Sequence, residues 1–262
     1  MAVVQNHVSL SGLSHVFEDG RAPLRVLDNL TFSVPRGRFL SIIGPSGCGK
    51  STLLRAIGGL LHPSEGVVSV DGEQPGRAQG RRDVGFVFQD PSLLPWRSVI
   101  ANVRLPLEIA GNGRVDNADP DAVLEMVGLA DFRNYYPHQL SGGMQQRVAL
   151  ARAIVFDPSL LLMDEPFGAL DEITRSAMRY ELLRIWQSQA PAAERRTVVF
   201  VTHSVAEAVA VSDRVIVLSK QPGRIVADVD IELPRPRTEE AERTQPFLDY
   251  TNHLRDVLRA AA

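Results

Sequence analysis

The segment GPSGCGKST has the residue types and the spacing needed to hold a nucleotide phosphate. It fits the pattern G-x-x-x-x-G-K-[ST], with the fixed positions at Gly44, Gly49, Lys50 and Ser51. The glycines let backbone N–H groups converge on an anion, a lysine at this place can bridge the β- and γ-phosphates, and a serine hydroxyl can bind Mg²⁺. A strand pattern precedes the loop and a helical pattern follows it, which is the context that gives the motif its mechanism. The predicted phosphate loop consists of Gly44, Pro45, Ser46, Gly47, Cys48, Gly49, Lys50, Ser51 and Thr52.

Two carboxylates end a predicted buried strand much further along the chain. The apolar run LLLM brings Asp164 and Glu165 to the carboxyl end of that strand, where open α/β sheets bind ligands. Asp164 is a candidate Mg²⁺ ligand through a water molecule, and Glu165 is a candidate base for a water that attacks the γ-phosphate. The plainer alternative is that the two acids only cap the strand. Because phosphoryl transfer needs positioning and charge compensation more than covalent chemistry, one base and one metal ion are sufficient.

A second possible anion site begins in the segment QLSGGMQQRVALARA, about ninety residues after the phosphate loop. Ser141 is placed to cap a helix, and Gly142 and Gly143 expose the first backbone N–H groups of that helix, an arrangement that favours anions. An ordinary helix start explains these residues equally well, because an apolar stripe that includes Met144 and Val148 would anchor the helix. These residues alone give no reason for one domain to hold phosphate at two separate places.

Composition limits the other functions that the chain can have. A net charge of −3 argues against a broad nucleic-acid surface, and the six histidines lack metal-site spacing, so we expect no nucleic acid and no zinc. The single cysteine excludes an intrachain disulfide and fits a reducing, cytosolic compartment. The N-terminal residues lack the basic start and apolar core of a signal peptide, and no apolar run approaches the roughly 18 residues of a membrane span. A role at a membrane would need another chain to supply the membrane part.

The hydrophobic pattern predicts one α/β domain over residues 1–262. Segments with a period of two fill the first forty residues, and strand and helix patterns alternate on both sides of a helical stretch. This alternation indicates a P-loop NTPase core with a mostly parallel sheet, accompanied by an N-terminal antiparallel β subdomain. We expect residues 1–91 and 146–235 to form the β subdomain and the core, 92–145 an inserted helical subdomain, and 236–262 a short helical tail.

The order of the motifs is more specific than any one of them. The phosphate loop, FQD, LSGGMQQR, LLLMDEP, GALD and VTH together closely resemble the ATP-binding subunit of ABC transporters over nearly the whole chain. The resemblance implies the ABC ATPase fold, ATP and Mg²⁺ as ligands, and ATP hydrolysis coupled to solute translocation. Because two such subunits dimerise head-to-tail in this family, it also implies a role for the second anion site. The LSGG turn, with Ser141, Gly142 and Gly143, would clamp the γ-phosphate held by the partner's phosphate loop.

The resemblance assigns roles to four further side chains. Gln89, after the strand GFVF, would approach Mg²⁺ and the attacking water, and His203 would contact the γ-phosphate and orient the water and Glu165. Asp171 would lie across the dimer interface and link the two sites. Phe17 would stack on adenine at a place where the family more often has tyrosine, and a core position is its alternative role. For His203, the alternative is a structural histidine at a strand end.

Looser similarities point to one branch of the family. PSLLPWRSVIANVRLPLEIAG and DEPFGALDEITR resemble the nitrate, sulfonate and taurine importers, and the forty or so residues after the last predicted strand are too few for the regulatory domain of sugar-type importer subunits. We therefore expect a peripheral subunit at the cytoplasmic face of the inner (plasma) membrane that drives uptake of a small anionic solute. Its partners would be transmembrane permease subunits and a second copy of itself, with an extracytoplasmic solute-binding protein as an indirect partner. An ABC exporter subunit and a soluble ABC-type ATPase are the alternatives.

Overall fold

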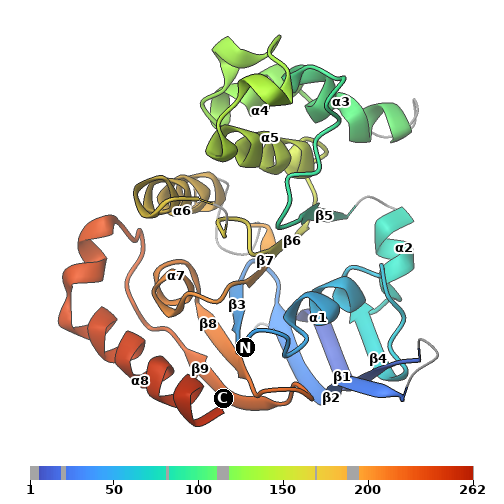
Figure 1. The fold of residues 1–262 in the computed structure, drawn as a ribbon, viewed down its shortest axis with the longest axis vertical. Helices are drawn as coiled ribbons and strands as arrows, with labels where there is room; N and C mark the ends of the chain where they lie inside the picture. The colour runs from blue at the N-terminus through green and yellow to red at the C-terminus, as the bar shows by residue number, and fades with distance from the viewer. Residues whose placement is uncertain are drawn as a thin grey trace, which may run out of the picture.

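The computed structural model describes residues 6–18, 22–80, 83–110, 118–168, 170–187 and 195–261. Residues 1–5, which belong to the N-terminal segment considered above as a signal peptide, lie outside the described residues. A lower part built on sheets and an upper part built of helices make up the molecule (Figure 1). The strands are β1 (Asn6–Phe17), β2 (Leu24–Pro35), β3 (Phe39–Ile43), β4 (Glu65–Val70), β5 (Val84–Val87), β6 (Leu160–Asp164), β7 (Thr197–Val201), β8 (Arg214–Leu218) and β9 (Ile225–Asp230). The α-helices are α1 (Lys50–Ile57), α2 (Pro75–Gly80), α3 (Val99–Ala110), α4 (Pro120–Met126), α5 (Gly142–Ile154), α6 (Glu172–Gln187), α7 (Val205–Val211) and α8 (Gln245–Ala261). The 3₁₀ helices are η1 (Ala130–Phe132), η2 (Pro137–Gln139) and η3 (Glu239–Arg243).

The lower part contains a six-stranded sheet with the strand order β5-β6-β7-β3-β8-β9. Neighbouring strands run parallel except for β9, which is antiparallel to β8. Every residue of β3, β6 and β7 is buried, which is the pattern of parallel strands covered on both faces. Strand β9 instead alternates between half-buried and exposed residues, as an edge strand does. The predicted α/β core with a mostly parallel sheet is therefore confirmed.

A smaller antiparallel sheet with the order β2-β1-β4 forms a second layer of the lower part. Strands β1 and β2 are twelve residues long and pair with several register shifts, which are the irregularities that bend an antiparallel sheet. The alternation seen in the first forty residues thus becomes paired β-structure, and β4 adds the third strand. The expected N-terminal antiparallel β subdomain is therefore present.

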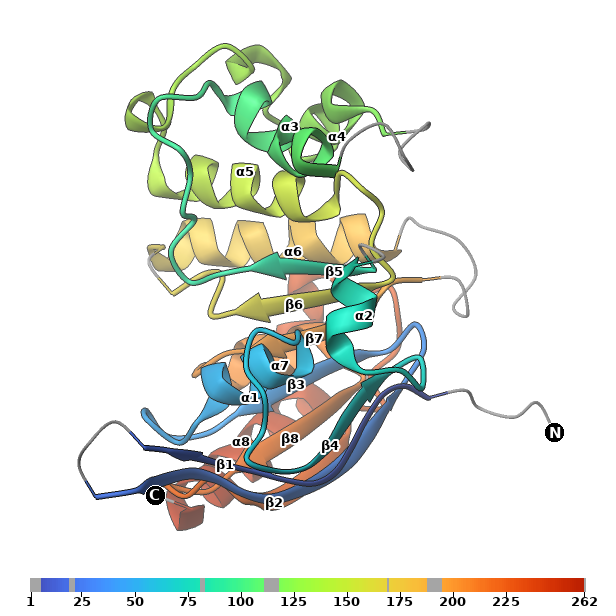
Figure 2. The same cartoon turned by 90° about the vertical axis from the view of Figure 1, so that its right-hand side faces the viewer.

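Two buried apolar clusters lie on opposite faces of the six-stranded sheet. Side chains alternate along each central strand, so Phe39 and Ile43 of β3 belong to the first cluster, whereas Leu40 and Ile42 belong to the second. The first cluster also contains the apolar faces of α5, α6, α7 and α8. The second cluster fills the space between the two sheets and includes Leu53 of α1. Helices α1 and α6 therefore lie on opposite sides of the main sheet, and Figure 2 shows α5 above α6.

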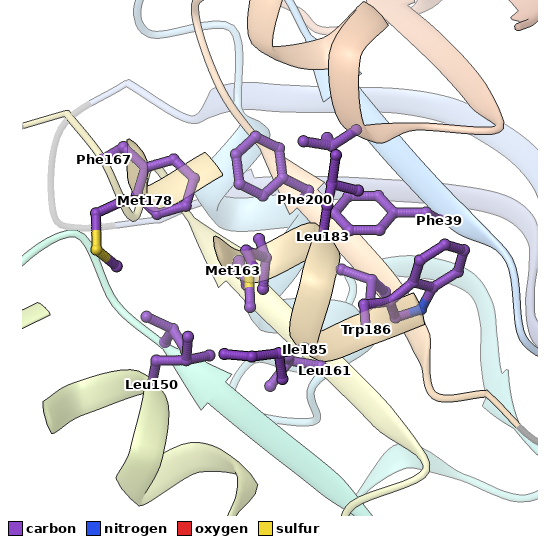
Figure 3. Close-up of a cluster of buried hydrophobic side chains, with 14 of the residues drawn as sticks. Phe39, Leu150, Leu161, Met163, Phe167, Met178, Leu183, Ile185, Trp186 and Phe200 are labelled. Atoms are coloured by element: carbon purple, nitrogen blue, oxygen red, sulfur yellow. The ribbon is translucent and has the colours of Figure 1, made fainter. Parts of the chain in front are cut away.

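The first cluster joins the upper and lower parts of the molecule (Figure 3). Phe39 meets Trp186 edge-on with ring centroids 5.5 Å apart, and the indole N–H of Trp186 donates to the carbonyl of Arg196 at 2.7 Å. Leu150 of α5 lies in the same cluster as Leu161 of β6 (Figure 3). Because apolar side chains of this kind stabilise by being removed from water together, their packing holds α5 against the sheet.

Helices α3, α4 and α5 form the upper part of the molecule (Figure 1). They correspond to the helical segment expected over 92–145, but α5 is one continuous helix that extends to Ile154, so the expected boundary after Gln145 falls inside it. The segment expected as a helical tail contains η3 and α8, and α8 contacts α7, β8 and β9. Within the ranges that the structure describes, no helix is long and apolar enough to cross a membrane.

Candidate active site

The phosphate loop connects β3 to α1, as the sequence pattern requires. Gly49 caps α1 with a φ of 99°, in the left-handed region that favours glycine. A Cβ atom built on Gly49 would lie 2.6 Å from Cδ2 of Leu27, so both the backbone conformation and the space demand glycine here. Gly47 has a φ of 77° with nothing within 4 Å of a built Cβ, so at this position only the conformation demands it.

The amine of Lys50 lies inside the phosphate loop. Its Nζ atom donates to the carbonyls of Gly44 at 2.9 Å and Pro45 at 3.1 Å, and the side chain is almost fully buried. The buried thiol of Cys48 lies 4.0 Å from the same amine, and burial raises the pKa of that thiol. The loop therefore holds a positive charge and keeps its cysteine away from solvent.

Ser51 and Asp164 bring two oxygen atoms together from α1 and the end of β6. The hydroxyl of Ser51 donates to Oδ1 of Asp164 at 2.9 Å. Burial raises the pKa of Asp164, the hydrogen bond from Ser51 lowers it, and the neighbouring charge of Glu165 raises it again. A buried carboxylate beside a hydroxyl suits Mg²⁺, a hard cation that is bound through one or two protein oxygens and the phosphates of its substrate. The described residues contain no cluster of three or more histidine, cysteine, aspartate or glutamate side chains that could hold a metal ion.

Glu165 and His203 meet at the carboxyl ends of two neighbouring strands. Strands β6 and β7 are parallel partners, so the residues that follow them lie side by side although they are far apart in the chain. The ring Nδ1 of His203 lies 3.0 Å from Oε2 of Glu165. Glu165 has a φ of 44°, which is uncommon for a residue with a side chain, and its N–H donates to the carbonyl of Val201 at 2.9 Å. The structure thus brings together the predicted base and the predicted histidine.

Gln89 reaches the same site from β5. A Cβ atom built on Gly168 would lie 3.6 Å from Oε2 of Glu165 and 3.8 Å from Nε2 of Gln89, so both side chains border this glycine. The loop that contains Gln89 is fastened to α5 by two residues that sequence analysis did not single out. Gln146 donates to the carbonyl of Phe88 at 3.3 Å.

Arg152 is the second residue that fastens this loop to α5. Its guanidinium group donates to the carbonyls of Pro91 at 2.6 Å and Ser92 at 2.8 Å. No local pattern identifies this role, because Arg152 and the carbonyls it binds are about 60 residues apart. Movement of α5 would therefore be transmitted to the loop after β5 through these hydrogen bonds.

The LSGG turn is a helix start on the other side of the main sheet from α1. Ser141 caps α5 by accepting a hydrogen bond from the N–H of Met144 at 3.3 Å. Ser141 and Gly142 are exposed, whereas a Cβ atom built on Gly143 would lie 2.9 Å from the methyl group of Thr174 in α6. The apolar residues of α5 belong to the first cluster and those of α1 to the second, so the helices that begin at the two anion sites pack on different sides of the main sheet.

Asp171 and Phe17 lie at the edges of this region. The carboxylate of Asp171 accepts hydrogen bonds from the backbone N–H of Thr174 at 3.0 Å and from its hydroxyl at 2.8 Å, and these bonds lower the pKa of Asp171. Asp171 is exposed and caps α6 within its own chain. Phe17 is 38% exposed at the end of β1, with its ring edge-on to that of His15. The alternative that Phe17 belongs to the core is therefore wrong.

Known proteins are similar to this chain over most of its length. A family model described as ABC transporter matches residues 27–168. The aliphatic sulfonates import ATP-binding protein of Bacillus cereus is 41% identical over 241 residues, covering 91% of this chain and 91% of that protein. The taurine import ATP-binding protein of Rhizobium johnstonii is 46% identical over 242 residues, covering 90% of this chain and 88% of that protein.

A solved structure shares the fold as well. The dimeric structure of an ATP-binding cassette in a post-hydrolysis state, bound to ADP and phosphate, matches with a TM-score of 0.73 and 34% identity, covering 87% of this chain and 100% of that chain. The predicted fold and the predicted ATPase activity are both confirmed by these comparisons. The chain therefore belongs to the ABC transporter family, as an ATP-binding subunit that hydrolyses ATP.

Proposed function

We propose that two copies of this chain bind and hydrolyse MgATP at two shared sites and thereby drive uptake of a small sulfonate anion through a separate permease. The observation that carries the proposal is the contact between Glu165 and His203, beside the hydrogen-bonded pair of Ser51 and Asp164. In this proposal Glu165 is the base, Ser51 and Asp164 are the metal-binding pair, and the amine of Lys50, inside the phosphate loop, binds phosphate.

Each side chain of the site has a role in this proposal. Mg²⁺, when bound by Ser51 and Asp164 with Gln89 nearby, supplies positive charge to the β- and γ-phosphates. Lys50 binds the same phosphates, and Glu165 accepts a proton from the water that attacks the γ-phosphate. His203 orients Glu165 through their 3.0 Å contact and the water through its exposed ring.

Phe17 and the phosphate loop hold the rest of the nucleotide. The exposed ring of Phe17 offers a surface on which adenine can stack. Besides Lys50 and Ser51, the backbone from Gly44 to Thr52 surrounds the phosphates, as expected for a glycine-rich loop at a helix N-terminus. In that loop Gly44, Pro45, Ser46, Gly47, Cys48 and Gly49 act mainly through their backbone.

Sharing of each site between two copies would give the second anion site a role. In one chain, the helix after the phosphate loop packs in the second apolar cluster and the helix after the LSGG turn packs in the first. A head-to-tail dimer would bring Ser141, Gly142 and Gly143 of one copy to the phosphate loop of the other. Asp171, exposed at the start of α6, would then lie at the interface between the copies. The dimeric cassette with which this chain shares its fold supports such an assembly.

Replacement of the base tests the catalytic assignment. We expect Glu165→Gln to bind ATP normally and to hydrolyse it at least about a hundredfold more slowly, which is the usual scale for a lost general base. Steady-state ATP hydrolysis and binding of a fluorescent nucleotide measure the two effects separately. Turnover close to that of the unchanged protein would contradict the role of Glu165.

Heterodimers with two different tags test whether the sites are shared. In a dimer of one Lys50→Ala copy and one Ser141→Ala copy, the shared-site arrangement leaves one site intact, because both defects fall in the other site. In a dimer of an unchanged copy and a copy with both substitutions, it leaves no site intact. We expect hydrolysis from the first dimer only. Sites contained within one chain would give the opposite result, with hydrolysis from the second dimer only.

The direction of transport and the cargo are inferred from the relatives. Both named relatives are import ATP-binding proteins, one for aliphatic sulfonates and one for taurine, which is itself a sulfonate. These relatives support import over export, and we propose that the chain lies at the cytoplasmic face of the plasma membrane, against a permease. The loop from Leu93 to Trp96, where Trp96 is largely exposed, is our candidate for the contact with the permease, because Arg152 fastens the preceding residues to α5.

Recovery of the partner from membranes tests this part of the proposal. Tagged Glu165→Gln, captured from detergent-solubilised native membranes with ATP and Mg²⁺, should bring a polytopic permease with it. The solute-binding protein of that permease should then bind taurine or an alkanesulfonate more tightly than nitrate in calorimetry. Capture of soluble partners alone from intact membranes would contradict the transporter role, and preference for nitrate would contradict the cargo.

A further inference from the structure

A buried ionic group lies behind the active site and connects the segments that carry Glu165 and His203. Glu207, in the first turn of α7, is only 4% exposed. Its carboxylate accepts a hydrogen bond from the hydroxyl of Thr202, which is its first partner. Thr202 directly precedes His203, and its hydroxyl oxygen also accepts a hydrogen bond from the N–H of Ser204 at 3.0 Å. The carboxylate of Glu207 therefore fixes both backbone neighbours of His203 through one threonine side chain.

Arg175 of α6 is the second partner of Glu207. Its Nε lies 3.7 Å from Oε1 of Glu207. The same guanidinium group donates to the carbonyl of Phe167 at 3.3 Å and to the carbonyl of Leu170 at 2.8 Å. These two carbonyls belong to the segment that leaves Glu165, and the N–H of Gly168 within it donates to the carbonyl of Glu165 at 3.0 Å. Arg175 thus holds the segment after the base in the same way that Glu207 holds the segment around the histidine.

The charges make this connection sensitive to substitution. A buried carboxylate is costly unless it is paired, and burial raises the pKa of Glu207 while Arg179 and Arg175 act against that rise. Arg179 is itself buried and contacts Glu242 at 3.0 Å, so it is already engaged with the segment before α8. Arg175 is the partner that also contacts the segment after Glu165. Loss of its charge, or of the charge of Glu207, would release both segments at once.

We propose that Glu207 and Arg175 are positioning residues for hydrolysis, which keep His203 in register with Glu165 and with the segment that leads to Asp171. The pair touches neither the predicted nucleotide nor the predicted metal ligands, and it acts through Thr202 and the carbonyls of Phe167 and Leu170. This inference rests on the proposed roles of Glu165 and His203. A shift of about 1 Å at a reacting group can lower a rate by about a hundredfold, so a small displacement of His203 is sufficient.

Steady-state kinetics on single and double variants test the proposal. In Glu207→Gln and Arg175→Met we expect kcat to fall by about 10- to 100-fold with the KM for ATP within about twofold of the unchanged protein, because positioning affects the reacting groups rather than the phosphate loop. The double variant should be no slower than the slower single variant, since each substitution already breaks the same contact. Glu181→Gln is the matched control, because Glu181 pairs with the exposed Arg184 on the outer side of α6.

Each outcome decides between positioning and a merely structural role. Unchanged kcat in both single variants, losses that multiply in the double variant, or an equal loss in Glu181→Gln would overturn the proposal. So would a loss of kcat that matches the unfolded fraction found by circular dichroism at the assay temperature. Glu165→Gln, assayed in parallel, separates this proposal from the one on which it rests. Full activity there refutes the assignment of the base, whereas an inactive Glu165→Gln with a fully active Glu207→Gln refutes the positioning pair alone.

Discussion

Removal of the Arg237 side chain should destabilise this fold strongly, because the side chain is buried and binds several backbone carbonyls. It lies in the segment between β9 and α8, is only 4% exposed, and donates to five backbone carbonyls. Three of these carbonyls, at Val209, Ala210 and Ser212, belong to the C-terminal end of α7, and the distances range from 2.5 to 3.4 Å. The other two, at Ile231 and Leu233, lie at 3.1 and 3.2 Å. The arginine therefore supplies donors that the end of a helix lacks.

The size of the effect follows from two opposing contributions. A hydrogen bond from a charged donor contributes about 1.5 kcal/mol at the lower end of its range. The two terminal nitrogens of Arg237 carry four N–H groups, which the five carbonyls share, so together they contribute about 6 kcal/mol. Burial lowers the pKa of Arg237 to about 10, which corresponds to a cost of about 3 kcal/mol for holding the charged form there. The difference leaves about 3 kcal/mol. We therefore expect Arg237→Met to lower the free energy of unfolding by about 3 kcal/mol.

Urea denaturation followed by far-UV circular dichroism measures this loss. Arg259→Met is the control, because Arg259 is 80% exposed in α8 and makes only an exposed contact with Asp256, so its loss should stay within about 0.5 kcal/mol. Arg237→Lys should fall between the two, since it keeps the charge but loses the fork of donors. A loss below about 1 kcal/mol in Arg237→Met would refute the accounting of the five carbonyls.

Three further predictions follow from single contacts. Burial, and secondarily the charge of Arg36, lowers the pKa of His7 to about 4. The contribution of neutral His7 to stability is therefore complete above about pH 6.5, and about 3 kcal/mol of it should be lost as the pH falls towards 4. Urea denaturation at several pH values measures this loss, and His7→Gln should make the stability less dependent on pH. Gly143→Ala should destabilise by about 1–2 kcal/mol in the same assay, and Thr174→Ser should rescue it by removing the methyl group at 2.9 Å. Cys48, fully buried with a raised pKa, should react with N-ethylmaleimide far more slowly in the folded protein than in urea, and equal rates would show that the loop is open.

Local chemistry explains why the catalytic groups could be predicted from the sequence. The phosphate loop combines glycines at positive φ with a lysine and a serine, and such a combination has few other uses. The carboxylates after LLLM follow from a buried strand whose end must meet the ligand-binding edge of a parallel sheet. The contact between Glu165 and His203 depends in addition on the order of the strands, because it requires β6 and β7 to be neighbours. Before the structure, the resemblance to a family implied that His203 orients Glu165, but the strand order itself comes from the structure.

Contacts between distant segments explain what sequence analysis missed. Strand β9 has the alternating pattern of an edge strand, but the charged residues around it resemble a solvated tail. Arg237 lies among charged residues and prolines in the sequence, which predicts an exposed side chain. Its burial depends on the end of α7, which lies beside it. Arg152 has the same property, since its acceptors are carbonyls of a loop about 60 residues away. Every residue has a backbone carbonyl, so the residue types do not show which carbonyls accept hydrogen bonds from a distant side chain. An arginine that binds carbonyls therefore cannot be distinguished, from the sequence alone, from an arginine that faces water.

The backbone at Glu165 shows how the two kinds of information combine. A residue with a side chain held at a φ of 44° costs about 1–3 kcal/mol and persists only where its surroundings over-determine it. Here the N–H of Glu165 is bound to the carbonyl of Val201, and its own carbonyl is bound by the N–H of Gly168. The first of these bonds comes from the pairing of β6 with β7, and the second comes from the segment that Arg175 holds. The carboxylate is identifiable from the sequence, but the conformation that turns it towards His203 is a property of the sheet and of the buried ionic group behind it.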